Sequence, residues 1–183
     1  MSGDLEPDTV EPDTKDWTWV LTQVCPECGY DAARVDLARI PALVVAYGSR
    51  WQEVLARADV ARRPRPGVWS PLEYACHVRD VFGLFDQRLR LMLTEDDPPF
   101  ANWDQDETAI AERYREADPT TVAGELTTAA DGIAASFAAV DGAQWTRTGR
   151  RSDGAVFTVD TFARYFLHDP VHHLHDVGPP QLT

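Results

Sequence analysis

The sequence has no apolar run that approaches the 18 or more residues of a membrane-spanning helix. Its first residues, MSGDLEPDTVEPDTKDW, are acidic and lack the basic and then apolar segments of a signal peptide. Three cysteines are present, and this odd, low count argues against a fold held by disulfides. Together these absences predict a cytoplasmic protein.

Basic residues are also scarce. Lysine and arginine number 17 against 30 acidic residues, which gives a formal net charge of −13. The average field of such a chain repels polyanions, so neither a nucleic-acid partner nor a membrane partner is expected. The two basic clusters, residues 57–65 and 147–151, are short. No internal repeat and no nucleotide-binding glycine motif occurs.

What the chain does have is helical periodicity. Its 183 residues are 44% apolar, which suits one domain with a real core. Apolar spacing predicts long helices over 33–59, 70–94 and 118–140, and a fourth from about Thr158 to Gly178. A shorter helical stretch is expected over 107–115.

This pattern predicts an all-α protein, a four-helix bundle with a long crossover loop. The expected domains are an N-terminal extension, 1–31, and the bundle, 32–178. Residues 1–16 are expected to be a disordered or loosely attached tail. A small hairpin or loop turning at 152–154 should precede the last helix.

Local signals sharpen some of these boundaries. Ser70, Pro71 and Glu73 form an N-cap, first-turn proline and capping-box partner for the second helix. Pro41 either kinks the first helix or marks its true start, and Pro170 predicts a kink in the last one.

Histidines supply the candidate chemistry. His168 and His172 are four residues apart and share a helix face, where they can bind one ion. His77 lies among apolar residues of the second helix. Three imidazoles would leave open positions on zinc, nickel, iron or copper. His173 should point about 100° away from His172, and His175 is a substitute ligand; the alternative is that all are core histidines.

The segment CPECG contains Cys25 and Cys28 and resembles half of a zinc ribbon or knuckle. Three interpretations stay open. The pair is an ordinary reduced turn; it is a redox or metal half-site completed by His175, Cys76 or a dimer partner; or it reaches the histidine site and changes its chemistry.

Three segments, WSPLEYACHVRDV, NWDQDETA and RRSDGAVFTVDTFARYFLHDPVHHLHDV, resemble the DinB/YfiT-like superfamily in an actinobacterial branch. The resemblance covers about residues 32–178. It implies a four-helix bundle, often a homodimer, with a divalent metal, usually zinc or nickel, on His77, His168 and His172.

The resemblance also implies a thiol-dependent enzyme. Relatives include a mycothiol-dependent maleylpyruvate isomerase and bacillithiol or mycothiol S-transferases. The isomerase relatives carry a glutamate at the first position of the helix-four pair. With His168 at that position, the resemblance favours the S-transferases, which join a small-molecule thiol to an electrophile.

Several charged residues are candidates for supporting roles. Glu73, Asp80, Asp169 and Asp176 could orient ligand rings, or serve as capping and surface charges. Arg164 could face substrate carboxylates. The functions left open are a metal-dependent thiol S-transferase, a non-catalytic metal-binding or stress-related protein, and a purely structural bundle.

Overall fold

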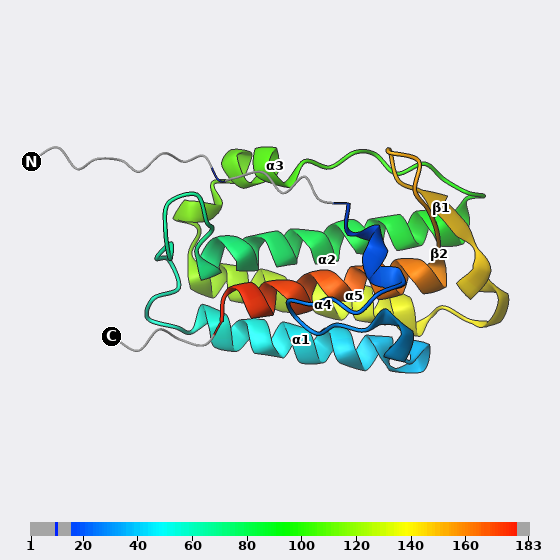
Figure 1. Ribbon diagram of the computed structural model, residues 1–183, viewed down its shortest axis with the longest axis horizontal. Helices are drawn as coiled ribbons and strands as arrows, with labels where there is room; N and C mark the ends of the chain where they lie inside the picture. The colour runs from blue at the N-terminus through cyan, green and yellow to red at the C-terminus, as the bar shows by residue number, and fades with distance from the viewer. Residues whose placement is uncertain (1–9, 11–15, 179–183) are drawn as a thin grey trace, which may run out of the picture.

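A computed structural model describes residue 10 and residues 16–178. Four long helices lie side by side in it: α1 (Ile40–Leu55), α2 (Pro71–Thr94), α4 (Pro119–Ala138) and α5 (Val159–Asp176), as Figure 1 shows. Helix α4 packs on α1 and α2, and α5 packs on the same two helices. The predicted four-helix bundle is therefore confirmed, while the expected tail at 1–16 lies almost wholly outside the described residues.

The first helix starts later than its periodicity predicted. Two 3-10 turns, Ala32–Arg34 and Leu37–Arg39, precede it, and Asp31 and Asp36 cap them by accepting backbone N–H groups. Pro41 occupies the first turn of α1. It marks a true start, because proline tolerates the first turn but breaks a helix interior.

Helix α2 begins as predicted. The Ser70 hydroxyl accepts the Glu73 N–H at 3.3 Å, and the Glu73 carboxylate accepts the Ser70 N–H at 2.8 Å. The Arg63 guanidinium also binds Glu73 at 2.5 Å. Although burial raises it, the pKa of Glu73 is lowered by Arg63 and Ser70. The structure thus uses Glu73 to cap α2.

The crossover between α2 and α4 carries α3 (Gln105–Ala111) and a 3-10 turn, Tyr114–Glu116. The predicted hairpin is present as β1 (Thr148–Arg150) and β2 (Val156–Thr158), antiparallel with Thr148 opposite Thr158. A side chain at Gly149 would meet the Phe100 ring at 2.5 Å, so this close approach requires glycine. The small sheet makes the protein mostly, rather than wholly, helical.

Helix α5 starts where β2 ends. Thr158 caps it by accepting the Thr161 N–H. Pro170 lies inside α5, which runs through it as one helix, and the Pro170 carbonyl accepts the Trp51 indole N–H at 3.3 Å. The expected kink there stays a prediction.

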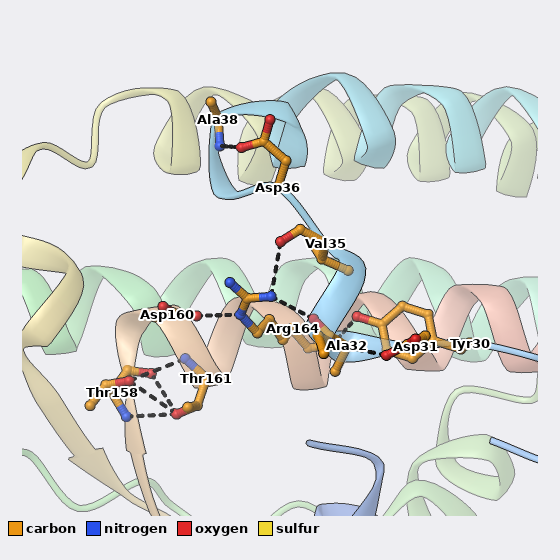
Figure 2. A network of polar contacts seen from close by, with 11 residues as sticks. Tyr30, Asp31, Ala32, Val35, Asp36, Ala38, Thr158, Asp160, Thr161 and Arg164 are labelled. Atoms are coloured by element: carbon orange, nitrogen blue, oxygen red, sulfur yellow. Dashed lines mark hydrogen bonds and ion pairs between the residues drawn. The ribbon is translucent and has the colours of Figure 1, made fainter. Parts of the chain in front are cut away.

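The segment before α1 is docked on α5. The Tyr30 hydroxyl donates to the Arg164 carbonyl at 2.6 Å, and the Arg164 guanidinium donates to the carbonyls of Ala32 and Val35 at 2.5 and 2.9 Å (Figure 2). Asp160 completes the network by pairing with Arg164. Arg164, expected to face substrate, instead anchors this segment. The division of the chain at residue 31 stays a prediction.

In the part of the chain that the structure describes, none of the helices has the length and apolar character that crossing a membrane requires.

Candidate metal centres

Helix α5 carries ligand residues for two separate clusters. One, the pocket cluster, is His77, Asp169 and His173; the other, the cysteine cluster, is Cys25, Cys28, His168 and His172. Within each cluster the ligand atoms all lie within 4.8 Å of one another. These are the two groups of three or more potential metal ligands among residue 10 and residues 16–178.

The pocket cluster joins α2 to α5. His77 Nε2 lies 3.3 Å from Asp169 Oδ2, and His173 Nε2 lies 3.8 Å from the same oxygen. The two imidazole rings are nearly perpendicular, with centroids 4.9 Å apart. One carboxylate oxygen therefore lies between two imidazole nitrogens from different helices.

Buried atoms of the pocket cluster lack partners. His77 is 1% exposed, and among the described residues neither its Nδ1 nor Asp169 Oδ1 has a hydrogen-bond partner. Burial raises the pKa of Asp169, but His77 and His173 outweigh it and lower this pKa to about 2. An ionised carboxylate with a spare oxygen, beside two imidazoles, fits a divalent cation.

Asp176 links the two clusters. Its Oδ2 lies 2.8 Å from His173 Nδ1, and its Oδ1 lies 3.8 Å from His172 Nε2. A carboxylate on the far nitrogen fixes the orientation of an imidazole ligand. Asp176, a candidate for orienting ligand rings, is placed to turn His173 Nε2 toward Asp169.

Aromatic rings hold the imidazoles of the pocket cluster. Trp103 stacks on His77 with centroids 5.5 Å apart, and Trp69 lies 5.4 Å from the same ring. Tyr74 lies 4.9 Å from the His173 ring. This frame limits rotation of the imidazoles and shields His77 from water.

Asp80, another candidate for orienting a ligand ring, contacts the residues around the pocket cluster rather than its imidazoles. It pairs with Arg79 at 2.7 Å and with the Tyr114 hydroxyl, and Tyr114 packs on Trp69. Asp80 therefore supports the aromatic frame and does not join either cluster.

Both clusters border one pocket of about 690 Å³. Asp169 and His173 line it together with Arg88 and Arg151. The Arg88 guanidinium donates to the Ala101 carbonyl at 3.0 Å, and no carboxylate among the described residues pairs with it. Burial lowers the pKa of Arg88 to about 10, so it is still a cation at neutral pH. The pocket can therefore bind a small anion beside the pocket cluster.

The cysteine cluster joins the N-terminal segment to α5. The CPECG turn closes when the Gly29 N–H donates to the Cys25 carbonyl at 2.9 Å, and Gly29 has a φ of +73°, which favours glycine. Cys25 Sγ lies 3.7 Å from His172 Nδ1. Burial raises the pKa of the Cys28 thiol to about 11, unlike the low value of a reactive cysteine.

The histidines of the cysteine cluster are buried. His168 is 4% exposed and His172 is 6% exposed, and His168 Nε2 has no hydrogen-bond partner in the part of the chain that the structure describes. Burial lowers the pKa of His168 to about 4, which keeps its imidazole neutral, as a metal ligand must be. The Trp17 ring packs on both, at 5.3 and 4.8 Å.

The structure divides the ligand set that the sequence predicted. His77 lies with Asp169 and His173, while His168 and His172 lie with the two cysteines. The two observed clusters, rather than one set of three histidines, are therefore the candidate metal centres. The third interpretation of the cysteine pair, that it reaches the histidines, agrees with this arrangement.

The sequence predicts that His173 points about 100° away from His172. That angle is what brings it to His77. The signal that could have revealed it is a second i, i+4 pair, Asp169 and His173, one residue after the first. His175, the expected substitute, has a side chain that is 53% exposed and joins neither cluster.

Comparison with known proteins agrees with the fold. The family model described as the DinB superfamily matches residues 48–177. A solved structure, YfiT from Bacillus subtilis, matches with a TM-score of 0.61 and 19% sequence identity over 91% of this chain and 89% of that chain. It is described as a probable metal-dependent hydrolase with an unusual four-helix bundle topology. No curated protein matches this chain in sequence.

Proposed function

The chain belongs to the DinB superfamily, and from this premise we propose that it is a metal-dependent thiol S-transferase. It would join a low-molecular-weight thiol, such as mycothiol, to a small anionic electrophile. The observation that carries the proposal is the convergence of His77, Asp169 and His173 beside a pocket that also holds an arginine without a carboxylate partner among the described residues.

The donor set of the pocket cluster suits a catalytic ion. Two imidazoles and one carboxylate would leave coordination positions open, whereas a structural site uses four protein ligands. When bound, zinc or nickel would supply a lowered thiol pKa and a fixed position for the thiolate. His77, Asp169 and His173 would hold the ion, and Asp176 would keep His173 in register.

Other residues prepare the pocket for an anionic substrate. Arg88 is half-buried and lies near Arg151, so a carboxylate entering the pocket gains a cationic partner. Trp103 and Trp69 cover His77 and keep water from one side of the cluster. The electrophile would then lie between Arg88 and the ligand atoms of α5.

A second candidate, a thiol-dependent isomerase, is favoured by one observation. The resemblance implies a glutamate at the first position of the helix-four pair in the isomerase relatives. The α5 pair that faces His77 is Asp169 and His173, so a carboxylate occupies that first position. The thiolate would add to a double bond and be eliminated after rotation, leaving the thiol unchanged.

One set of assays separates these reactions. Untagged protein is loaded with zinc or nickel and given thiol plus monobromobimane, thiol plus a cis-unsaturated dicarboxylate, or an ester without thiol. We expect metal-dependent conjugation of the bimane. Isomerisation without net thiol consumption would select the second candidate. Hydrolysis of the ester without thiol would contradict both the transferase and the isomerase and would indicate a hydrolase. No reaction by metal-loaded protein would also contradict both and would indicate a non-catalytic metal-binding protein.

The variants His173→Ala and His175→Ala form a matched pair on the same helix. His173→Ala should abolish conjugation and His175→Ala should keep it, since His175 is exposed and outside both clusters. Arg88→Met should raise KM for carboxylate-bearing electrophiles and leave the neutral bimane unaffected. Equal effects on both substrates would remove Arg88 from the proposal.

A further inference from the structure

We propose that Cys25, Cys28, His168 and His172 form a closed, structural zinc site that holds the N-terminal segment on helix α5. This site is separate from the pocket cluster and uses none of its residues. It does not depend on the proposed function, because its ligands, burial and position differ from those of the pocket cluster.

The spacing of the four residues is that of a known kind of zinc site. Cys25 and Cys28 are separated by two residues, and His168 and His172 by three. Structural zinc sites with two cysteines and two histidines combine these two spacings. The cysteine half is already bent for binding, because the Gly29 N–H bonds the Cys25 carbonyl and the Cys25 N–H donates to the Tyr30 carbonyl at 2.8 Å.

The distances between the four ligand atoms are already close to those of a tetrahedral zinc site. Zinc bonds of about 2.3 Å to sulfur and about 2.0 Å to nitrogen place tetrahedral ligand atoms about 3.3–3.8 Å apart. Cys25 Sγ and His172 Nδ1 already lie 3.7 Å apart, and all four ligand atoms lie within 4.8 Å. Side-chain rotation alone can close the remaining gap.

Two atoms in the cluster point independently to a cation. His168 is 96% buried, since 4% of it is exposed, and its Nε2 has no hydrogen-bond partner within residue 10 and residues 16–178. A buried imidazole nitrogen without a partner is costly unless an unseen atom satisfies it. His172 turns Nδ1 toward Cys25, while its Nε2 lies 3.3 Å from Glu27 Oε2. A carboxylate on the second nitrogen is typical of histidines that bind zinc.

Four protein donors fill a tetrahedral ion, so this site has no position for substrate. Its role is to fix the chain before α1. Glu27 and Trp17 line the pocket; Glu27 contacts His172, and Trp17 packs on both His168 and His172. Tyr30 and Arg164 dock the same segment further along α5 (Figure 2). The ion would therefore set one wall of the pocket.

Cobalt substitution tests the site directly. Cobalt in the cysteine cluster should show thiolate-to-metal charge-transfer absorption, which the pocket cluster cannot produce because it contains no sulfur. Untagged wild-type protein should bind one zinc ion in each cluster by elemental analysis. Cys28→Ser should lose one equivalent and the charge-transfer absorption.

Three further variants serve as controls. Cys76→Ala removes a buried cysteine of α2 outside the cluster and should keep the ion and the absorption. Cys28→His replaces the thiolate with another zinc ligand and should keep the zinc ion. This variant is the control for the case in which Cys28→Ser fails to fold. His173→Ala should lose the other ion but keep the absorption, so failure of the pocket cluster and failure of this site give different results.

Absence of thiolate absorption in wild-type protein loaded with cobalt would overturn the zinc site. So would an unchanged zinc content in Cys28→Ser, measured on protein that is folded by circular dichroism. A disulfide between Cys25 and Cys28 in protein purified under reducing conditions would also overturn it.

Discussion

The two clusters share helix α5 and differ in almost everything else. The pocket cluster has two nitrogens and a carboxylate, contacts α2 and borders the pocket. The cysteine cluster has two sulfurs and two nitrogens, contacts the N-terminal segment and buries its histidines. Three donors suit an ion that must accept a substrate, and four suit an ion that only holds the chain.

The contrast shows that nearness along a helix does not decide which metal cluster a ligand residue belongs to. His172 and His173 are adjacent, yet they belong to different clusters because they point about 100° apart. What decides their roles is the partner that each direction meets. His173 meets His77 of α2, and His172 meets Cys25.

The largest expected effect comes from removing a ligand of the pocket cluster. Asp169→Ala should lower activity by more than about 100-fold, the upper range seen when an outer-shell partner is lost. It should remove one metal ion and leave the ion of the cysteine cluster in place. Elemental analysis with a rate measurement checks both, and loss of both ions would show that the clusters are not separate.

Removing zinc from the cysteine cluster should mainly lower stability. An ion present at about 1,000 times its Kd adds about 4 kcal/mol to the folded state. In a protein of this size that corresponds to about 8–16 °C in Tm. Thermal unfolding of Cys28→Ser against Cys76→Ala measures the difference, and equal Tm values would contradict a structural ion.

Removing the Arg63–Glu73 ion pair at the start of α2 should affect the pocket cluster more than the cysteine cluster. Glu73 is 2% exposed and paired with Arg63, so Glu73→Gln removes one charge of a buried ion pair and should cost about 3 kcal/mol. His77 lies one turn further along α2 and should bind its ion less tightly. Urea unfolding and metal titration check this, with an unchanged cysteine cluster as the internal control.

The ion pair of Glu73 and Arg63 should also make the stability of the protein fall at acid pH. The pKa of Glu73 is lowered from its ordinary value of 4.5. Its stabilisation is therefore complete above that value and is lost as the pH falls through the lower folded value. Wild-type protein should lose this part of its stability in acid, whereas Glu73→Gln should not; parallel pH profiles would exclude the pair as the cause.

The smallest expected effect is at Asp176. Asp176→Asn keeps the shape but removes the carboxylate charge that is hydrogen-bonded to His173 and lies 3.8 Å from His172, so both clusters should lose metal affinity, by about 10-fold at the pocket cluster. Glu27→Gln should weaken the cysteine cluster alone, because Glu27 contacts His172. Competition with a chelator measures each affinity, and an Asp176→Asn effect confined to one cluster would show that the carboxylate serves only that one.

Local signals predicted much of the fold. Helices α2 and α5 begin where expected, because each start depends on residues close together in sequence. These are the capping box of Ser70 and Glu73 for α2 and the Thr158 cap for α5. The start of α1 was predicted too early, because its apolar spacing continues back through two 3-10 turns that Asp31 and Asp36 cap. Periodicity alone does not distinguish such turns from helix.

The site was harder to predict because it depends on contacts between distant segments. The sequence identified α5 and His77, but it did not show that His77 faces His173, 96 positions away. Spacing also gave no sign that the Arg164 guanidinium, a candidate for facing substrate carboxylates, donates to the carbonyls of Ala32 and Val35. Side-chain partners of this kind are set by packing rather than by spacing.

Asp176 has one further consequence. Its two oxygens approach His173 and His172, one from each cluster, so an ion that polarises either imidazole changes the charge that the other one experiences. Thermodynamic coupling between two binding events is reciprocal. Under the two proposals above, ions bound at both clusters would therefore change each other's affinity by the same factor. Docking of the N-terminal segment and metal binding at the pocket cluster would then be coupled through the Asp176 carboxylate.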